Sequence, residues 1–277
     1  MSDIPGSEPS APVEVPNRAR TNEDIQVAAD KWCENPIEAE AIYGHISFWD
    51  VSTITSMRYL FRWKRSFNED LSRWNVSACT DMEYMFAGAS SFTSDLSEWS
   101  TGNVKSMWWM FGGASSFTSD LSEWSTGNVK SMAWMFCYAS SFTSDLSKWS
   151  TGKVESMYAM FYGASSFTSD LSEWSTGKVE SMARMFTGAS SFTSDLSEWI
   201  VMEGTDVDSM FDGCPCDDFR PVWEERRQVQ KAKDECWERR LPWMVAIAPY
   251  IRGEVTEAAI QTVFDIDGLI KFITSFM

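Results

Sequence analysis

Carboxylates that recur at a fixed step are the first residues of this chain whose spacing is suited to chemistry. Six carboxylates in one column repel one another unless hydrogen bonds or a bound cation compensate their charge. Calcium bridging between them needs several oxygens per ion, whereas an aspartate readily accepts backbone N–H groups of its own turn. We expect the turn role and keep calcium bridging as the alternative. The six residues, each 25 positions after the last, are Asp70, Asp95, Asp120, Asp145, Asp170 and Asp195.

Other residue types that carry catalysis are scarce or do not combine into a site. His45 is the single histidine, which excludes any site that needs two imidazoles. The six cysteines form no C-x-x-C pair, and Cys214-Pro215-Cys216 has no second pair, so packed thiols are favoured over zinc. No Ser-His-Asp, Cys-His, P-loop or G-x-G-x-x-G pattern is present. We therefore expect no enzyme, no catalytic residue, no cofactor and no metal.

Charge and hydropathy exclude further classes of protein. The 277 residues include 40 acidic and 23 basic side chains, a formal net charge of −17. Such acidity argues against a nucleic-acid partner, which requires a basic footprint. No apolar run reaches the length of a membrane span. The polar, proline-rich start shows neither a signal peptide nor an anchor. We expect a cytoplasmic location rather than the cell surface.

An internal repeat of 25 residues must position these groups. Hydrophobic residues recur at this step without an insertion, and steps of 20–29 residues are typical of leucine-rich-repeat coils, in which each coil is one strand and one return segment. A single coil cannot bury its own apolar face, so neighbouring coils must stack. The recurring columns run from Trp49 to Trp199, from Phe61 to Phe211, from Phe67 to Phe192 and from Leu71 to Leu196.

Within one coil, the pattern predicts a strand and a short helix. Apolar residues over Val104–Ala114 fall at steps of three and four, one face of a helix. Gly113 stands where such a helix would end in the left-handed conformation, although Trp63 and Tyr138 at the same position indicate that this conformation is not obligatory. The strand is expected over Asp95–Trp99. An all-β solenoid with three short strands per coil is the alternative.

These columns together resemble a known repeat. The string W-x-V-S-x-x-T-x-M-x-x-M/L-F-x-x-x-x-x-F-x-x-D-L-S-x-W, best preserved over Trp49–Trp74 and Trp74–Trp99, is similar to the repeat of BspA-like leucine-rich-repeat surface proteins. The resemblance covers about residues 45–214. It implies an α/β fold, an LRR-like solenoid of six to seven strand–helix coils, used in protein binding or adhesion. The family pattern contains no catalytic residue.

The flanks differ from the repeats in composition. We expect a disordered acidic arm over 1–22, a helical N-terminal cap over 23–46 whose first helix is capped by Asn22, the solenoid over 47–214, and a helical C-terminal cap or extension over 215–277. The apolar tail Leu269–Met277 also offers a partner-binding or membrane-surface helix. We expect a monomer, or a weak oligomer formed through this helix.

Aromatic residues at outward positions are the candidate binding site. If Met107, Met110 and Phe111 face the core, the positions between them face solvent. Exposed aromatics in line favour an interaction surface, with partial burial between neighbouring coils as the alternative. The sequence thus predicts a scaffold that binds another protein through this stripe or through the strand face, with a surface adhesin or glycan-binding protein as the alternative. The stripe residues are Tyr59, Trp63, Tyr84, Trp108, Trp109, Trp134, Tyr138, Tyr158 and Tyr162.

Overall fold

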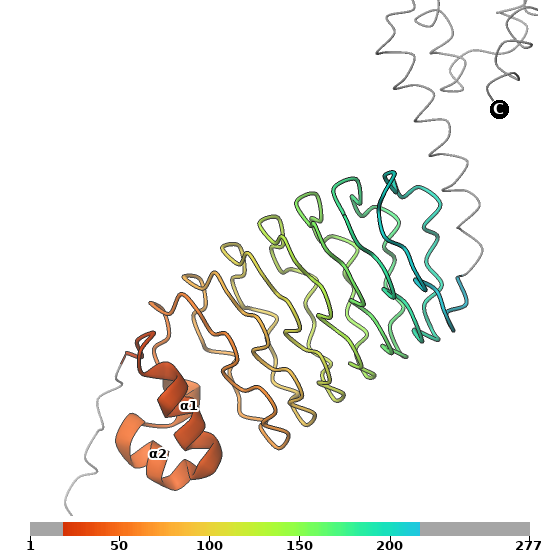
Figure 1. Cartoon of the computed structure of the whole chain (residues 1–277). Helices are drawn as coiled ribbons and strands as arrows, with labels where there is room; N and C mark the ends of the chain where they lie inside the picture. The colour runs from red at the N-terminus through yellow and green to blue at the C-terminus, as the bar shows by residue number, and fades with distance from the viewer. Residues whose placement is uncertain (1–18, 217–277) are drawn as a thin grey trace, which may run out of the picture. The chain divides into compact units, whose positions relative to one another are not determined.

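The computed structural model describes residues 19–216 (Figure 1). Most of the expected N-terminal arm and nearly all of the expected C-terminal cap lie outside the described residues. Two helices come first: α1, Ile25–Glu34, and α2, Pro36–Tyr43, followed by the short 3-10 helix η1, Ile46–Phe48. Within residues 19–216, no helix is both long enough and apolar enough to cross a membrane.

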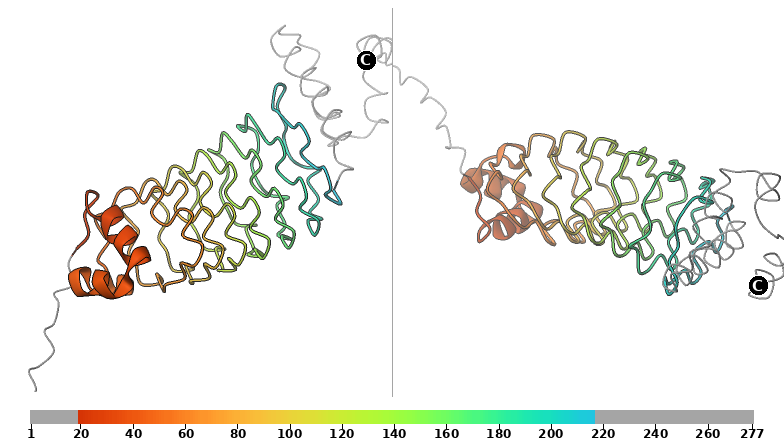
Figure 2. Two further views of the ribbon diagram at one scale, coloured as in Figure 1. Left: turned by 60° about the horizontal axis from the view of Figure 1, so that its bottom comes forward. Right: turned by 90° about the horizontal axis from the view of Figure 1, so that it is seen from above.

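The two helices cover the edge of the first coil (Figure 2). Helix α1 buries Ile25, Ala28, Ala29 and Trp32 in the common core. Asn22 does not cap it, contrary to expectation, because its side-chain oxygen instead accepts the backbone N–H groups of the coil at positions 55 and 56, at 3.0 and 3.4 Å. The segment before the helix thus satisfies the donors that the first coil would otherwise leave open.

Successive 25-residue coils then lie side by side, joined by single parallel β-bridges (Figure 1). After the bridge, four alternate N–H groups of each coil donate to carbonyls of the next, for example from Tyr84 to Trp108 at 2.9 Å and from Phe86 to Met110 at 2.9 Å. The N–H groups between them close turns within the coil. The pairs that join coils are Ser56–Asp81, Asp81–Ser106, Ser106–Ser131, Ser131–Ser156, Ser156–Ser181 and Ser181–Asp206, and Ala19–Asp50 joins the segment before the helices to the first coil.

The segment Val104–Ala114, where the sequence predicts a helix, forms consecutive turns instead. An α-helix commits each N–H to the carbonyl four residues earlier, whereas here every second N–H leaves for the next coil. Trp109 has φ +54° and Gly113 has φ +75°, and a positive φ at the third residue is the mark of a type II turn. Apolar spacing of three and four therefore arises from turns as well as from helices.

The left-handed conformation is used at these two positions in every coil. At the Gly113 position, Trp63 and Tyr138 also have positive φ, 60° and 55°, so their departure from glycine does not relax the backbone requirement, contrary to expectation. At the Trp109 position, all seven residues from Tyr59 to Ser209 have φ between 50° and 65°. The stacking of peptide groups on the next coil imposes this geometry on side chains that ordinarily avoid it.

Stacked aromatic columns form the core. The ring centroid of Phe111 lies 5.6 Å from that of Phe86 and 5.7 Å from that of Phe136, and the rings of each pair are nearly parallel. The tryptophan column also carries a polar link, because the Trp124 indole N–H donates to the Leu96 carbonyl of the preceding coil at 2.9 Å. The same bond recurs from Trp99 to Trp199, which explains why this column holds tryptophan rather than phenylalanine.

The expected strand Asp95–Trp99 is a turn. The Trp99 N–H donates to the Leu96 carbonyl at 3.1 Å, which brings both side chains to the core despite their spacing of three. The residues that pair across coils lie seven positions after Trp99, at Ser106 and its equivalents.

Candidate functional site

The stripe is positioned by the turns that follow each bridge. The residue with positive φ in the first turn, such as Trp109, stands on the outward side while its neighbours Met107 and Met110 are fully buried. Each coil repeats this turn, so outward side chains lie above one another. The structure brings all nine predicted residues onto this series of turns.

Rings stack along the central file of the stripe. Tyr59 and Tyr84 have ring centroids 5.0 Å apart, Tyr84 and Trp109 are stacked at 5.5 Å, and Trp109 and Trp134 are stacked at 4.9 Å and 11°. In the next coil the file position holds Ala159, and the adjacent residue Tyr158 lies 5.2 Å from Trp134, tilted by 57°. Because stacked rings cover one another's faces, the middle rings present mainly their edges to solvent.

The remaining stripe residues flank this file. The ring centroids of Trp108 and Tyr84 are 5.1 Å apart, and those of Tyr138 and Tyr162 are also 5.1 Å apart. A hydrogen bond with Tyr162 raises the pKa of Tyr138 above its ordinary value. Trp63 rests on the next coil at Gly88, where an added Cβ would come within 2.0 Å of its ring.

Exposure within the stripe is uneven. Trp63 and Tyr138 are more than half exposed, at 54% and 57%, and Tyr59 is 37% exposed. The other six are half-buried between neighbouring coils. Both the solvent-facing position and the alternative of partial burial therefore describe the stripe: the rings shield one another and leave their outer edges in water.

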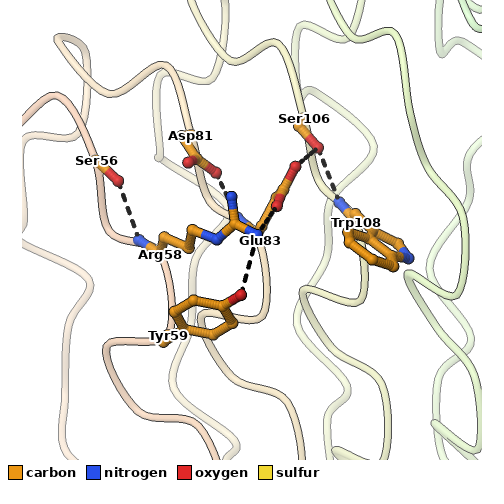
Figure 3. A network of polar contacts seen from close by, with 7 residues as sticks. All are labelled: Ser56, Arg58, Tyr59, Asp81, Glu83, Ser106 and Trp108. Carbon is orange, nitrogen blue, oxygen red and sulfur yellow. Dashed lines mark hydrogen bonds and ion pairs between the residues drawn. The ribbon is translucent and has the colours of Figure 1, made fainter.

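Arginines frame the N-terminal end of the stripe, and sequence reasoning missed them. The Arg58 guanidinium forms an ion pair with Glu83 at 2.8 Å and donates to the Tyr59 hydroxyl at 3.0 Å, which raises the pKa of Arg58 (Figure 3). Ser106 donates to the other oxygen of Glu83 at 2.7 Å. Arg62 lies over three rings of the stripe. The available signal was the occurrence of Arg58 and Arg62 beside Tyr59, at positions where no later coil carries arginine.

The aspartate column acts within its own turns. Asp120 accepts the Ser122 N–H at 2.9 Å and the Ser144 hydroxyl of the next coil at 3.1 Å, while that hydroxyl accepts the Leu121 N–H at 2.8 Å. Bonds from the Ser122 backbone and side chain lower the pKa of Asp120. In the described part of the chain, no three His, Cys, Asp or Glu residues are grouped to hold a metal.

His45 and four of the cysteines in the described part of the chain occupy structural positions. His45 Nδ1 accepts the Ser47 N–H at 3.3 Å at the start of η1. Burial raises the pKa of Cys79 to about 11 and that of Cys137 to about 12, which makes both poor nucleophiles. Cys214 and Cys216 are buried with their sulfurs 3.1 Å apart, and the Cys216 thiol contacts the Phe192 carbonyl.

Comparison with curated proteins and with solved structures gave no match. One family profile matches twice, over residues 35–147 and 119–219, which together cover more than half of the chain. The matched region coincides with the tandem repeats and includes every residue of the aromatic stripe. The chain therefore belongs to the family described as Mycoplasma protein of unknown function, DUF285.

Proposed function

We propose that this protein is a non-catalytic repeat scaffold, an LRR-like solenoid of the BspA-like kind, that binds another protein through the aromatic stripe. The observation that carries the proposal is the file of rings from Tyr59 to Trp134 on the outward turns of consecutive coils, with Tyr158 of the next coil in contact with its last ring. Tyrosine and tryptophan in clusters are the residues that dominate binding energy at protein interfaces. The parallel bridges between residues 25 apart support the solenoid part of the proposal.

The contrast between inward and outward positions supports a binding role for the rings. The inward columns of tryptophan, phenylalanine and leucine keep one residue type from coil to coil because the core demands it. At the Trp109 position the chain also carries Ala159, Arg184 and Ser209 with the same backbone conformation. The scaffold therefore accommodates small or charged side chains there, so aromatic residues are not required by the fold.

The alternative, a surface adhesin or glycan-binding protein, has less geometric support. A sugar stacks on the free face of a ring, whereas the faces of Tyr84, Trp109 and Trp134 are stacked along the file. Trp63 and Tyr138 are the most exposed rings of the stripe, but they lie beside this file and do not form a row of their own. Ring edges in a row suit the apolar side chains of a protein partner better than a sugar platform.

The test removes two rings and keeps the scaffold. The double variant Trp109→Ala/Trp134→Ala copies the residue that the chain itself uses at Ala159. The control is Glu123→Ala/Lys148→Ala, which removes an exposed ion pair outside the stripe. Proteins captured from cell extract by the wild type and the control should be lost by the ring variant, as measured by quantitative mass spectrometry.

Two outcomes would contradict the proposal. If the ring variant captures the same proteins in the same amounts, the stripe does not bind them. If the variant fails to fold, the rings belong to the core. A glycan array with the same three proteins distinguishes the alternative: sugar binding that depends on the rings would favour the adhesin or glycan-binding role.

A further inference from the structure

Arg62 is held on the stripe by aromatic rings alone. Its guanidinium carbon lies 5.2 Å from the Tyr59 ring centre, 5.6 Å from that of Trp63 and 4.9 Å from that of Tyr84. These distances are within the range of cation–π attraction. An arginine that rests on rings in this way is ordered before any partner arrives, while its in-plane N–H donors remain able to bind an anion.

Two neighbouring cations, Arg58 and Lys64, already have carboxylate partners, whereas Arg62 has none among the described residues. Arg58 pairs with Glu83 at 2.8 Å, and Lys64 pairs with Asp30 at 2.8 Å. Within residues 19–216, no ion pair or side-chain hydrogen bond engages the Arg62 guanidinium. Its position combines a preordered cation with a row of apolar ring edges.

The charge at this position is confined to one coil. In later coils the equivalents of Arg62 are Ala87, Gly112, Cys137, Tyr162, Thr187 and Asp212. Residue types that the fold needs recur in every coil, so an arginine that occurs once is not required by the scaffold. It is also a positive charge in a chain whose net charge is −17, and five of the 23 basic residues lie between Arg58 and Arg73.

We propose that Arg62, held on Tyr59, Trp63 and Tyr84, binds an aspartate or glutamate carboxylate of a partner segment whose apolar side chains lie along the ring edges of the stripe. This inference rests on the proposed protein-binding function and specifies the chemistry of the partner. A guanidinium matches a carboxylate with two parallel N–H···O bonds. Ring edges carry the positive part of the aromatic quadrupole, so they favour the same anion.

A carboxylate fits this place better than a phosphate group. A phosphate near neutral pH carries up to two negative charges and usually requires several donors and cations. Arg58, which lies over the same Tyr59 ring as Arg62, is already neutralised by Glu83. One guanidinium with apolar surroundings suits a singly charged carboxylate next to hydrophobic residues.

The probe is a random peptide library displayed on phage, selected on the full-length wild-type protein. We expect enriched sequences that combine apolar residues with an aspartate or glutamate. The most enriched peptide is then synthesised with that residue as glutamate, as glutamine and as phosphoserine, and binding is measured by fluorescence anisotropy. The wild type should bind the glutamate peptide roughly tenfold more tightly than the glutamine peptide, the effect of one charge-assisted contact.

Variants of the full chain separate the two parts of the stripe. Arg62→Gln should abolish the preference for glutamate but retain the affinity for the glutamine peptide. Arg65→Gln is the matched control, because Arg65 is an exposed neighbour that should leave the preference unchanged. Trp109→Ala/Trp134→Ala should weaken the binding of both peptides and leave the ratio of their affinities near its wild-type value.

The outcomes distinguish failure of this inference from failure of the proposed function. Peptides that depend on the tryptophans but show no glutamate preference, or a preference that Arg65→Gln removes equally, would overturn the inference alone. Tighter binding of the phosphoserine peptide would overturn the choice of carboxylate. If no selected peptide depends on the tryptophans, both proposals fall. Self-association lost in Arg62→Gln, measured by sedimentation, would make a second copy of this chain the occupant and also overturn the inference.

Discussion

The coils over residues 57–163, here called the ring-bearing coils, and those over residues 164–213, the plain coils, share one scaffold and differ on their outward turns. Both use the same inter-coil hydrogen bonds and the same phenylalanine and tryptophan columns. The central file holds Tyr59, Tyr84, Trp109 and Trp134 in the first four ring-bearing coils, and Arg184 and Ser209 in the plain coils. The fifth ring-bearing coil has Ala159 at this position and keeps Tyr158 and Tyr162 beside it. Stacking therefore fixes the inward residues and leaves the outward residues free to differ.

Backbone geometry makes the comparison sharper. Arg184 has φ +58° and Ser209 has φ +52°, as positive as the φ of +54° at Trp109. Non-glycine residues in this conformation cost about 1–2 kcal/mol each. The plain coils bear that cost without any ring at the position, so the strain belongs to the scaffold and the rings are an addition to it.

The largest expected effect concerns the core, where the two regions should behave alike. Phe111→Ala in the ring-bearing coils and Phe186→Ala in the plain coils each remove a fully buried ring. Each should lower the free energy of unfolding by about 3–5 kcal/mol, because a cavity remains in a packed interior. Denaturant titration measures both. A much smaller loss in one region would show that its coils are not equally packed.

A glycine pair separates backbone strain from ring displacement. Gly88→Ala and Gly188→Ala both place a side chain at positive φ, +73° and +71°, so each should cost about 1 kcal/mol. At Gly88 the new Cβ would lie 2.0 Å from the Trp63 ring, whereas at Gly188 the nearest atom is 3.6 Å away. Gly88→Ala should therefore also move the Trp63 ring.

Nuclear magnetic resonance of the indole N–H groups reports this difference. The Trp63 signal should shift in Gly88→Ala and remain unchanged in Gly188→Ala. Equal spectra in the two variants would mean that Trp63 is not seated on Gly88 in solution. Trp63 would then be free to move away from the Arg62 guanidinium.

Much of this arrangement follows from the sequence, and the reasons for the misses are physical. The 25-residue period identifies Phe111 and Trp124 as inward, because stacked coils must repeat their core. It does not reveal the consecutive turns, since Tyr, Trp, Ala, Arg and Ser give no local signal for a left-handed residue. The contact of the Arg62 guanidinium with aromatic rings was missed because it depends on Tyr59 and Tyr84, which belong to two coils and whose distance is set by stacking.

Acid should act on both regions through the aspartate column. Hydrogen bonds from their own turns lower the pKa values of Asp70, Asp95, Asp120, Asp145 and Asp170. A carboxyl with a lowered folded pKa contributes stability above its unfolded pKa of about 3.9 and loses that contribution as the pH falls through the folded value. Thermal stability should therefore fall below about pH 4.

Matched variants test the source of this acid sensitivity. Asp120→Asn and Asp170→Asn, one in each region, should reduce the acid-dependent part of the stability to a similar extent. Thermal unfolding followed by circular dichroism between about pH 3 and pH 7 measures it. If the slope is unchanged in both variants, other carboxylates control acid stability.

The smallest expected effect is the absence of a change beneath the stripe. Cys137 lies three residues after Trp134 and is buried, and its pKa is raised to about 12, so at pH 8 only about one thiol in ten thousand is ionised. If the rings are additions to the scaffold, Trp109→Ala/Trp134→Ala should leave Cys137 as slow toward iodoacetamide as it is in the wild type. Peptide mapping by mass spectrometry follows this residue, and denatured protein gives the fully reactive rate. A strong acceleration in the folded double variant would mean that the rings close the coils over Cys137, and the ring-bearing coils would then depend on their aromatic residues for structure as well as for binding.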